Sequence, residues 1–266
     1  MIKVCIAGAT GWTGRAVAEG VLSADDLTLS GAVARGAAGR DLGVAWASAP
    51  LGITVADSVD QGLAVADVLV DYTSPEAVKA HTLAAVARGV HVVIGTSGLT
   101  ADDFADINTA ARDAGVGVVA AGNFSLTAAM AQAAAILVAP FLPQREVIDY
   151  ASSTKPDAPS GTARELAERL GQVSTHPLAT PISATIGYPE ARGASIAGTQ
   201  VHSLRLPSFV VSTEIVFAQF DERLVIRHDA GSSPAPYVAG TLLAVRIVNQ
   251  HIGLVRGLDT LLLAGH

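Results

Sequence analysis

The chain has 266 residues, half of them hydrophobic but only 5% aromatic, and a formal net charge of −7. This balance leaves no basic face for nucleic acid or an anionic membrane, so we expect neither as a partner. The single cysteine, Cys5, lies in an apolar run, which excludes an intramolecular disulfide and favours a reducing cytoplasm. The first residues enter a strand at once and carry no signal-peptide features.

Strands and helices are expected to alternate through the first half of the chain. Short apolar runs predict strands over 2–8, 27–34, 65–72, 90–98 and 116–123, and amphipathic segments predict helices over 13–23, 74–89 and 100–115. Ser74 before Pro75, and Thr100 three residues before Asp103, have the spacing of helix starts. The alternation predicts an α/β fold with a Rossmann-type, doubly wound parallel sheet over residues 1–123.

The second half changes character. The Ala-rich segment 126–142 is interrupted by Gln132 and Pro140 and favours a buried helix over a membrane span. Strands are expected over 145–153, 180–189, 194–207, 209–220 and 222–230, with little helix between them. We therefore predict a second, α+β domain over 124–234, built on a mixed sheet. A final helix within 235–266 is expected to pack back on the first domain.

Three glycines follow the first strand directly, in the stretch "GATGWTG". Gly8, Gly11 and Gly14 give a tight turn in which backbone N–H groups approach a pyrophosphate at a helix N-terminus. Glycines alone also suit an ordinary strand-to-helix turn, but this place in a βαβ chain favours a dinucleotide.

The tip of the second strand bears on the choice of cofactor. It carries Ala34 and Arg35 and no carboxylate. An acidic residue there would accept from a ribose 2′-hydroxyl, whereas a guanidinium suits a 2′-phosphate. We therefore predict NADPH in preference to NADH; the alternative is that Arg35 is a solvated loop residue.

The stretch "STKPDAPSGTARELAERL" combines a lysine with a helix start. Ser160, Gly161 and Thr162 stand where free backbone N–H groups and the helix dipole favour an anion, and Lys155 adds a positive charge. Thr162 and Glu165 also have capping-box spacing, so an ordinary helix start is the alternative. From the residues alone these two interpretations stay open.

Five stretches together resemble the dihydrodipicolinate reductase family. They are "GATGWTG", "DYTSPEA" at 71–77, "VIGTSGLT" at 93–100, "NFSL" at 123–126 and "KPDAPSGTA" at 155–163. The resemblance spans essentially the whole chain. It implies a Rossmann domain, a substrate domain that also forms a homotetramer, and nicotinamide-dependent reduction of a cyclic dicarboxylate.

The resemblance also assigns residues. Lys155, Gly161 and Thr162 match the residues that hold the carboxylates of the substrate, and Ser160 is added from its place at the helix start. The residues that match the cofactor site are Gly8, Gly11, Gly14, Thr73, Gly95, Thr96, Asn123 and Phe124. Arg35 and the turn residues Thr10, Trp12 and Thr13 are added to this site, although the family usually carries arginine where this chain has Trp12.

One departure concerns the proton donor. The family carries a His-His pair where this chain has Ala151 and Ser152, and neither can act as imidazolium does. Lys155 is our first choice as the catalytic proton donor and water the second, with Tyr150 and His202 as further candidates. His202 alternates with apolar residues, so packing in the sheet is an equally good interpretation.

The sequence therefore predicts a cytoplasmic NAD(P)H-dependent oxidoreductase. Its substrate would be 4-hydroxy-tetrahydrodipicolinate or a closely related cyclic imine carboxylate. A second hypothesis is an imine or dehydroamino-acid reductase of a specialised pathway, and a third is a non-catalytic NADPH-binding regulatory or scaffold protein. No Cys or His cluster has metal-ligand spacing, so no metal is expected.

Overall fold

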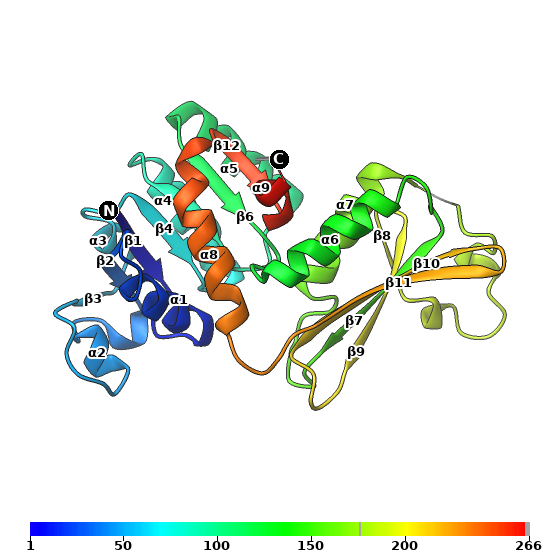
Figure 1. Ribbon diagram of the computed structural model, residues 1–266, viewed down its shortest axis with the longest axis horizontal. Helices are drawn as coiled ribbons and strands as arrows, with labels where there is room; N and C mark the ends of the chain where they lie inside the picture. The colour runs from blue at the N-terminus through cyan, green and yellow to red at the C-terminus, as the bar shows by residue number, and fades with distance from the viewer. Residues whose placement is uncertain (176, 264–266) are drawn as a thin grey trace. The chain divides into compact units, whose positions relative to one another are not determined.

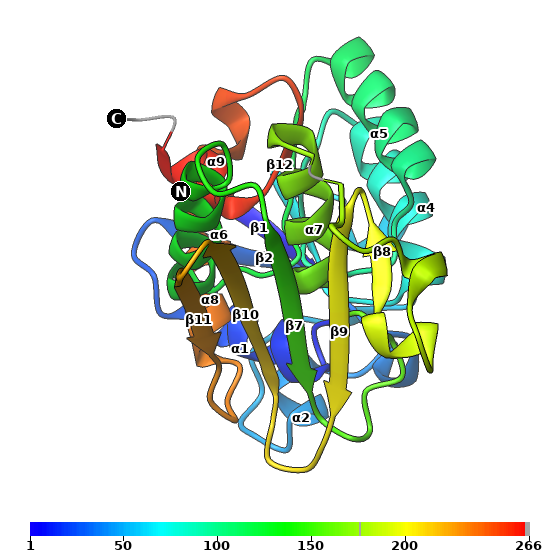
Figure 2. The same ribbon diagram turned by 90° about the vertical axis from the view of Figure 1, so that its right-hand side faces the viewer.

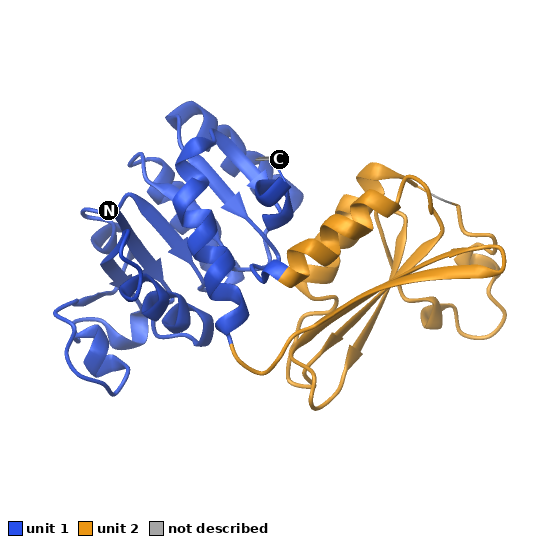
Figure 3. Cartoon of the chain, in the orientation of Figure 1, with its two compact units in different colours: residues 1–126, 234–266 blue, residues 127–233 orange. Residues whose placement is uncertain are grey.

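The computed structural model describes residues 1–175 and 177–263, which divide into two compact units. The first comprises residues 1–126 and 234–266, and the second comprises residues 127–233 (Figure 3). Each unit has its own sheet and its own cluster of buried apolar side chains.

The first unit is built on a parallel sheet. Within the described residues its seven strands run in the order β12-β6-β5-β4-β1-β2-β3, and each neighbouring pair is parallel. The predicted doubly wound sheet is thus confirmed, and its Val-rich strands are buried on both faces, as parallel strands require. The strands are β1 (Ile2–Ala7), β2 (Leu27–Val33), β3 (Val55–Ala56), β4 (Val68–Asp71), β5 (His91–Ile94), β6 (Gly117–Ala120) and β12 (Gly253–Arg256).

Helices cover both faces of this sheet, with α1 and α8 in front of it and α4 and α5 behind it in Figure 1. The helix starts were predictable: Thr100 and Asp103 form the expected capping box, and Pro75 is the first residue of α4. The helices are α1 (Trp12–Leu22), α2 (Leu42–Ala45), α3 (Val59–Gly62), α4 (Pro75–Val86), α5 (Ala101–Ala114), α8 (Ala235–Ile247) and α9 (Leu258–Leu263), with short 3-10 turns η1 (Arg35–Ala37) and η4 (Val248–Gln250).

The prediction of one helix within 235–266 is only partly right. The helix α8 ends at Ile247, and Gly253, whose φ is +88°, starts the strand β12 beside β6. Gly253 takes a left-handed backbone conformation that a helix cannot contain, and the apolar residues after it complete the edge of the sheet. The last predicted residues, 264–266, lie outside the described residues.

The second unit is an α+β domain with a mixed sheet, as predicted. Figure 2 shows β11, β10, β7 and β9 side by side; β7 and β9 are parallel, and the other described pairs are antiparallel. The helices α6 and α7 pack their apolar residues against one face. The elements are α6 (Leu126–Val138), β7 (Arg145–Ala151), α7 (Gly161–Val173), η2 (Ile182–Ala184), η3 (Pro189–Arg192), β8 (Ala194–Ile196), β9 (Thr199–Arg205), β10 (Val211–Gln219) and β11 (Glu222–Asp229).

The strand predicted over 180–189 is wrong. This segment contains η2 and the start of η3, joined by bends. Pro181 and Pro189 have no N–H to donate to a neighbouring strand, and Gly187 has a φ of +101°, which is not strand backbone.

Candidate functional site

The glycine-rich turn between β1 and α1 has no room for side chains at two positions. Gly8 has a φ of +83°, and a Cβ on it would lie 2.1 Å from the carbonyl oxygen of Tyr72. A Cβ on Gly14 would lie 2.2 Å from the carbonyl oxygen of Gly8. The N–H of Gly11 donates to that same oxygen at 2.8 Å and closes the turn at the start of α1. The turn therefore presents backbone, and not side chains, at a helix N-terminus, which is the arrangement that a pyrophosphate needs.

A cavity of about 380 Å³ opens beside this turn. It brings together predicted cofactor residues from three segments of the chain: Gly8, Thr10, Gly11, Arg35 and Thr73. Asp57 and His81 line it as well and were missed, because neither belongs to a motif that the sequence made visible.

A buried carboxylate links the turns that follow β4 and β5. Asp71 ends β4 and is fully buried. Its Oδ1 accepts hydrogen bonds from Thr73 N at 3.0 Å, Thr73 Oγ1 at 2.7 Å and Thr96 Oγ1 at 2.7 Å, and its Oδ2 lies 2.8 Å from His81 Nδ1. Thr73 and Thr96 are thus held by one group. The available sequence signal for Asp71 is an acidic residue at the end of an apolar strand.

The other predicted cofactor residues of this unit do not line the cavity. Gly95 makes room for Tyr72, since a Cβ there would lie 2.1 Å from Tyr72 Cε1. Phe124 is buried with its ring edge-on to Tyr72, at 6.3 Å between centroids, and Asn123 Oδ1 accepts from Ser125 N at 2.8 Å. These residues shape the packing around the cavity.

Trp12 is the first residue of α1. Its side chain is 53% exposed, and its ring lies edge-on to Tyr237 with 6.0 Å between centroids. Thr13 follows it in the first turn of α1. An exposed aromatic ring thus stands at the N-terminus of the helix, next to the glycine turn.

In the second unit, a buried carboxylate on the neighbouring strand β7 binds the N-cap residue of α7. Ser160 is the N-cap, and its Oγ accepts from Ala163 N at 3.3 Å. Asp149 of β7 is fully buried and accepts from Ser160 N at 2.9 Å and from Ser160 Oγ at 2.6 Å. Asp149 also accepts from Ser203 Oγ at 3.0 Å and Arg205 Nη2 at 2.8 Å.

Ser160, and not Thr162, is therefore the helix cap, so the capping-box interpretation of Thr162 and Glu165 is wrong. Thr162 is buried in the first turn of the helix. Lys155 lies on the loop before it, with Nζ 2.8 Å from Asp157 Oδ1. Lys155, Ser160, Gly161 and Thr162 thus lie within one loop and helix start, which we call the cradle. Asp149 and Arg205, which hold the cradle, were missed.

Two further proton-donor candidates lie on the other face of this sheet. Neighbouring strand residues point to opposite faces, so Tyr150 and His202 face away from Asp149 and from Ser203. His202 Nε2 lies 2.7 Å from Glu146 Oε2. Burial raises the pKa of the Tyr150 hydroxyl, and the nearby Glu214 carboxylate adds to the shift. Neither side chain is therefore a suitable acid for the cradle.

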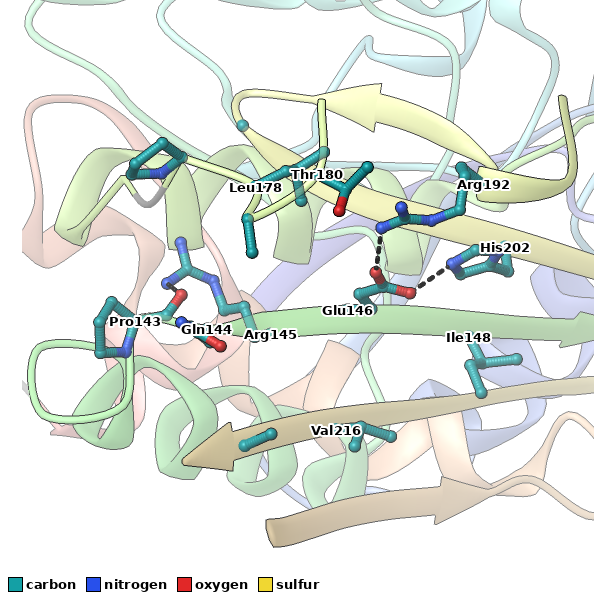
Figure 4. A pocket seen from close by; sticks show the side chains of 14 residues that line it. Pro143, Gln144, Arg145, Glu146, Ile148, Leu178, Thr180, Arg192, His202 and Val216 are labelled. Atoms are coloured by element: carbon teal, nitrogen blue, oxygen red, sulfur yellow. Dashed lines mark hydrogen bonds and ion pairs between the residues drawn. The ribbon is translucent and has the colours of Figure 1, made fainter. Parts of the chain in front are cut away.

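This opposite face holds a larger cavity, of about 680 Å³ (Figure 4). Figure 4 shows Arg192 and His202 converging on Glu146, with Arg192 Nη2 3.2 Å from Glu146 Oε1. Glu146, Arg192 and His202 are therefore occupied with one another. Arg145 donates to the carbonyl oxygens of Leu170 and Ser174. No residue of the cradle lines this cavity.

Across residues 1–175 and 177–263, no group of three or more His, Cys, Asp or Glu side chains could hold a metal ion. Nor does this part of the chain contain a helix that is long and apolar enough to cross a membrane.

Comparisons with known proteins agree with this architecture. The sequence matches "Dihydrodipicolinate reductase, N-terminus" over residues 2–124 and "Dihydrodipicolinate reductase, C-terminus" over residues 122–262. It is 37% identical over 263 residues to 4-hydroxy-tetrahydrodipicolinate reductase of Moorella thermoacetica, with 98% of each chain covered. It is 35% identical over 270 residues to the enzyme of that name from Synechococcus elongatus, again with 98% of each chain covered.

A similar solved structure is the dipicolinate-bound dihydrodipicolinate reductase from Paenisporosarcina. It has a TM-score of 0.76 and 27% identity, and the match covers 98% of this chain and 99% of that one. The resemblance inferred from the motifs is thereby confirmed. Two matched halves and full-length relatives lead to one conclusion: the chain belongs to the dihydrodipicolinate reductase family.

Proposed function

We propose that this chain is an NAD(P)H-dependent reductase that acts on 4-hydroxy-tetrahydrodipicolinate or a closely related cyclic imine carboxylate. The observation that carries the proposal is the cradle, a helix start fixed by buried Asp149 directly beside a lysine loop. The names of the relatives support the same substrate. In this proposal residues 1–123 bind the dinucleotide, and residues 124–234 bind the substrate and form the oligomer.

The turn at Gly8 fits a nicotinamide dinucleotide, because its glycines pack closely on backbone and leave N–H groups, and not side chains, at the start of α1. When bound, the cofactor supplies the hydride. Arg35 lines the same cavity and supports NADPH as the preferred form, since a guanidinium pairs with a 2′-phosphate. Asp57 lines it too and supports NADH as a second cofactor, because a carboxylate accepts from a ribose hydroxyl.

The cradle would bind the carboxylates of the substrate. Gly161 is the first residue of α7, so its N–H lies in the turn whose donors have no partner within the helix. The helix dipole favours negative charge there, and Lys155 adds a full positive charge. Thr162 would add a further donor, whereas Ser160, whose N–H and hydroxyl both donate to Asp149, would hold the helix start in place.

Lys155 Nζ remains the first choice for the proton that follows hydride addition, and water the second. Tyr150 and His202 are set aside because they face the opposite side of the sheet. Ala151 has no ionisable proton and the Ser152 hydroxyl is far less acidic than imidazolium, so neither position supplies an acid.

The absence of an acidic side chain at positions 151 and 152 favours a second candidate, an imine reductase of a specialised pathway. A substrate that enters as a protonated iminium needs no acid from the protein, whereas a neutral imine or enamine does. The histidine-free segment 151–154 would suit the first kind of substrate.

We further propose a cytoplasmic homotetramer, assembled through the sheet face that α6 and α7 leave uncovered. Apolar side chains are exposed on the strands and on the hairpin of this sheet, including Val225 at 45% and Phe220 at 100%. Light scattering during gel filtration measures the assembly directly.

One assay separates the candidate functions. NADPH oxidation is followed with enzymatically generated 4-hydroxy-tetrahydrodipicolinate and, in parallel, with simple cyclic imine carboxylates. Turnover of the first substrate supports the reductase named by the relatives, and turnover of the second alone supports the specialised enzyme. Binding of NADPH without turnover of either substrate refutes both and leaves a scaffold. Ser152→His should accelerate only a reaction that lacks an acid; Ala151→His is avoided because that position is fully buried.

A further inference from the structure

Arg205 connects the buried Asp149 to the far end of the cradle loop. Its Nη2 donates both to Asp149 Oδ2 at 2.8 Å and to the carbonyl oxygen of Asp157 at 2.6 Å. Asp149 itself accepts hydrogen bonds from Ser160, which lies three residues after Asp157 in the chain. Both ends of segment 157–160 therefore bind the same ion pair. Ser160 donates to the Asp149 carboxylate, and the carbonyl oxygen of Asp157 accepts from the Arg205 guanidinium.

The ion pair also sets the charge beneath the cradle. The Asp149 carboxylate accepts from the N-cap residue of α7, so its negative charge lies at the helix end where the substrate carboxylate is expected. An uncompensated anion at that position would repel a second one, and burial would strengthen the repulsion. Arg205, only 17% exposed, supplies the compensating charge.

The register of the strands explains how Arg205 reaches this position. Arg205 lies directly across from Ala151, and Ser203 lies across from Asp149. Because Ala151 is small and fully buried, this face of the sheet is open to the long side chain of Arg205. Arg205 is thus the cross-strand partner of Ala151, the position at which the resemblance expects a histidine.

Arg205 does not have the character of a substrate ligand. Its Nη2 already serves two acceptors, its Nη1 donates to Leu204 O at 2.9 Å, and its buried Nε has no partner among the described residues. We propose that Asp149 and Arg205 are positioning residues that hold the cradle loop and neutralise the charge beneath it. This inference rests on the proposed function for its ligand, but the loop geometry can be tested without one.

The first experiment titrates the NADPH-saturated full chain with pyridine-2,6-dicarboxylate (dipicolinate) by calorimetry. Asp149→Asn and Arg205→Met should each raise the dissociation constant of dipicolinate by about tenfold or more, since bonds between charged groups are lost. The dissociation constant of NADPH should stay within about twofold, and Arg205→Lys should restore part of the affinity because it keeps the charge. The matched control is Glu146→Gln, on the same strand but the opposite face and also paired with an arginine; it should leave dipicolinate affinity unchanged.

The second experiment measures amide hydrogen exchange without ligand. Exchange over residues 157–163 should accelerate in Asp149→Asn and Arg205→Met, while exchange in β4 and β5 should not change. Should an Asp149 variant fail to fold, Ser203→Ala, which removes one donor to the same carboxylate, takes its place.

The outcomes are distinct. If wild-type protein does not bind dipicolinate, the proposed substrate is contradicted. The positioning role of Asp149 and Arg205 is then tested by hydrogen exchange alone. Unchanged exchange over 157–163 overturns the inference. A parallel loss of NADPH and dipicolinate affinity also overturns it, because that pattern shows general destabilisation.

Discussion

Substituting Gly14 by alanine tests the close packing of helix α1 on the glycine turn. The added Cβ would lie 2.2 Å from the carbonyl oxygen of Gly8 and 2.8 Å from its carbonyl carbon. An ordinary carbon–oxygen contact is about 3.3 Å, so the helix and the turn must separate by about 1 Å. Both partners are backbone, and no change of rotamer can relieve the overlap.

The cost of this overlap should appear in stability, in cofactor affinity, or in both. Overpacking of this kind costs about 1–3 kcal/mol. If the free protein retains the native turn, the melting temperature should fall by about 2–12 °C for a chain of this size. If the turn relaxes instead, cofactor binding must restore it, and the dissociation constant of NADPH should rise by about 5- to 150-fold.

The assay is calorimetric titration with NADPH, together with thermal unfolding of the same preparations. Gly231→Ala is the matched control, since a Cβ on Gly231 would meet no atom within 4 Å and the residue does not line the cavity. We expect the control to bind NADPH like wild type. The reasoning is refuted if Gly14→Ala binds NADPH normally at an unchanged melting temperature, or if both variants weaken binding equally.

Three further predictions concern the first unit. Arg35→Ala should raise the KM for NADPH by about tenfold relative to that for NADH, because the charged partner of a 2′-phosphate is lost. An unchanged ratio of the two KM values would contradict the predicted preference for NADPH. Thr96→Val should destabilise the protein by about 1–3 kcal/mol in denaturant unfolding, since it removes a donor to the buried Asp71, and a change as small as that of exposed Thr109→Val would contradict this account. His91 has a pKa lowered mainly by burial, and its Nδ1 accepts from Gly117 N. The folded state thus takes up the proton at lower pH than the unfolded state, so stability should be lost as the pH falls through about 6.5 toward the lower folded value, and His91→Gln should reduce that loss.

The long elements of the first half were predictable because each carries its own local signal, whereas the short α2, β3 and α3 were not predicted. Hydrophobic runs of four to seven residues, a capping box at Thr100 and a proline at the start of α4 act within a few residues of one another. The strand β12 was not predicted because its signal lies in pairing with β6, more than 100 residues earlier. The segment 180–189 was mistaken for a strand because its prolines and glycine were given too little weight.

The residues of the candidate site also fall into those with a local sequence signal and those without one. Motifs revealed the glycine turn and the cradle, since their residues are close together in the sequence. Asp71, Asp149 and Arg205 were missed because their role depends on burial and on partners from distant strands. Arg205, for example, meets Asp149 only through the pairing of β7 with β9. Because side chains alternate along a strand, His202 and Arg205 lie on opposite faces of β9, but the alternation alone does not tell which face carries the cradle.

The most direct test of the proposed reaction compares wild type with Lys155→Met on 4-hydroxy-tetrahydrodipicolinate, with the absorbance of the reduced nicotinamide as the readout. We predict that wild type consumes one reduced cofactor per substrate reduced, and that the variant binds NADPH normally but loses most of its kcat/KM. Equal turnover by the two proteins would contradict the role of Lys155. Wild-type protein that binds NADPH yet oxidises none of it with this substrate or with any cyclic imine carboxylate would contradict the proposed function itself.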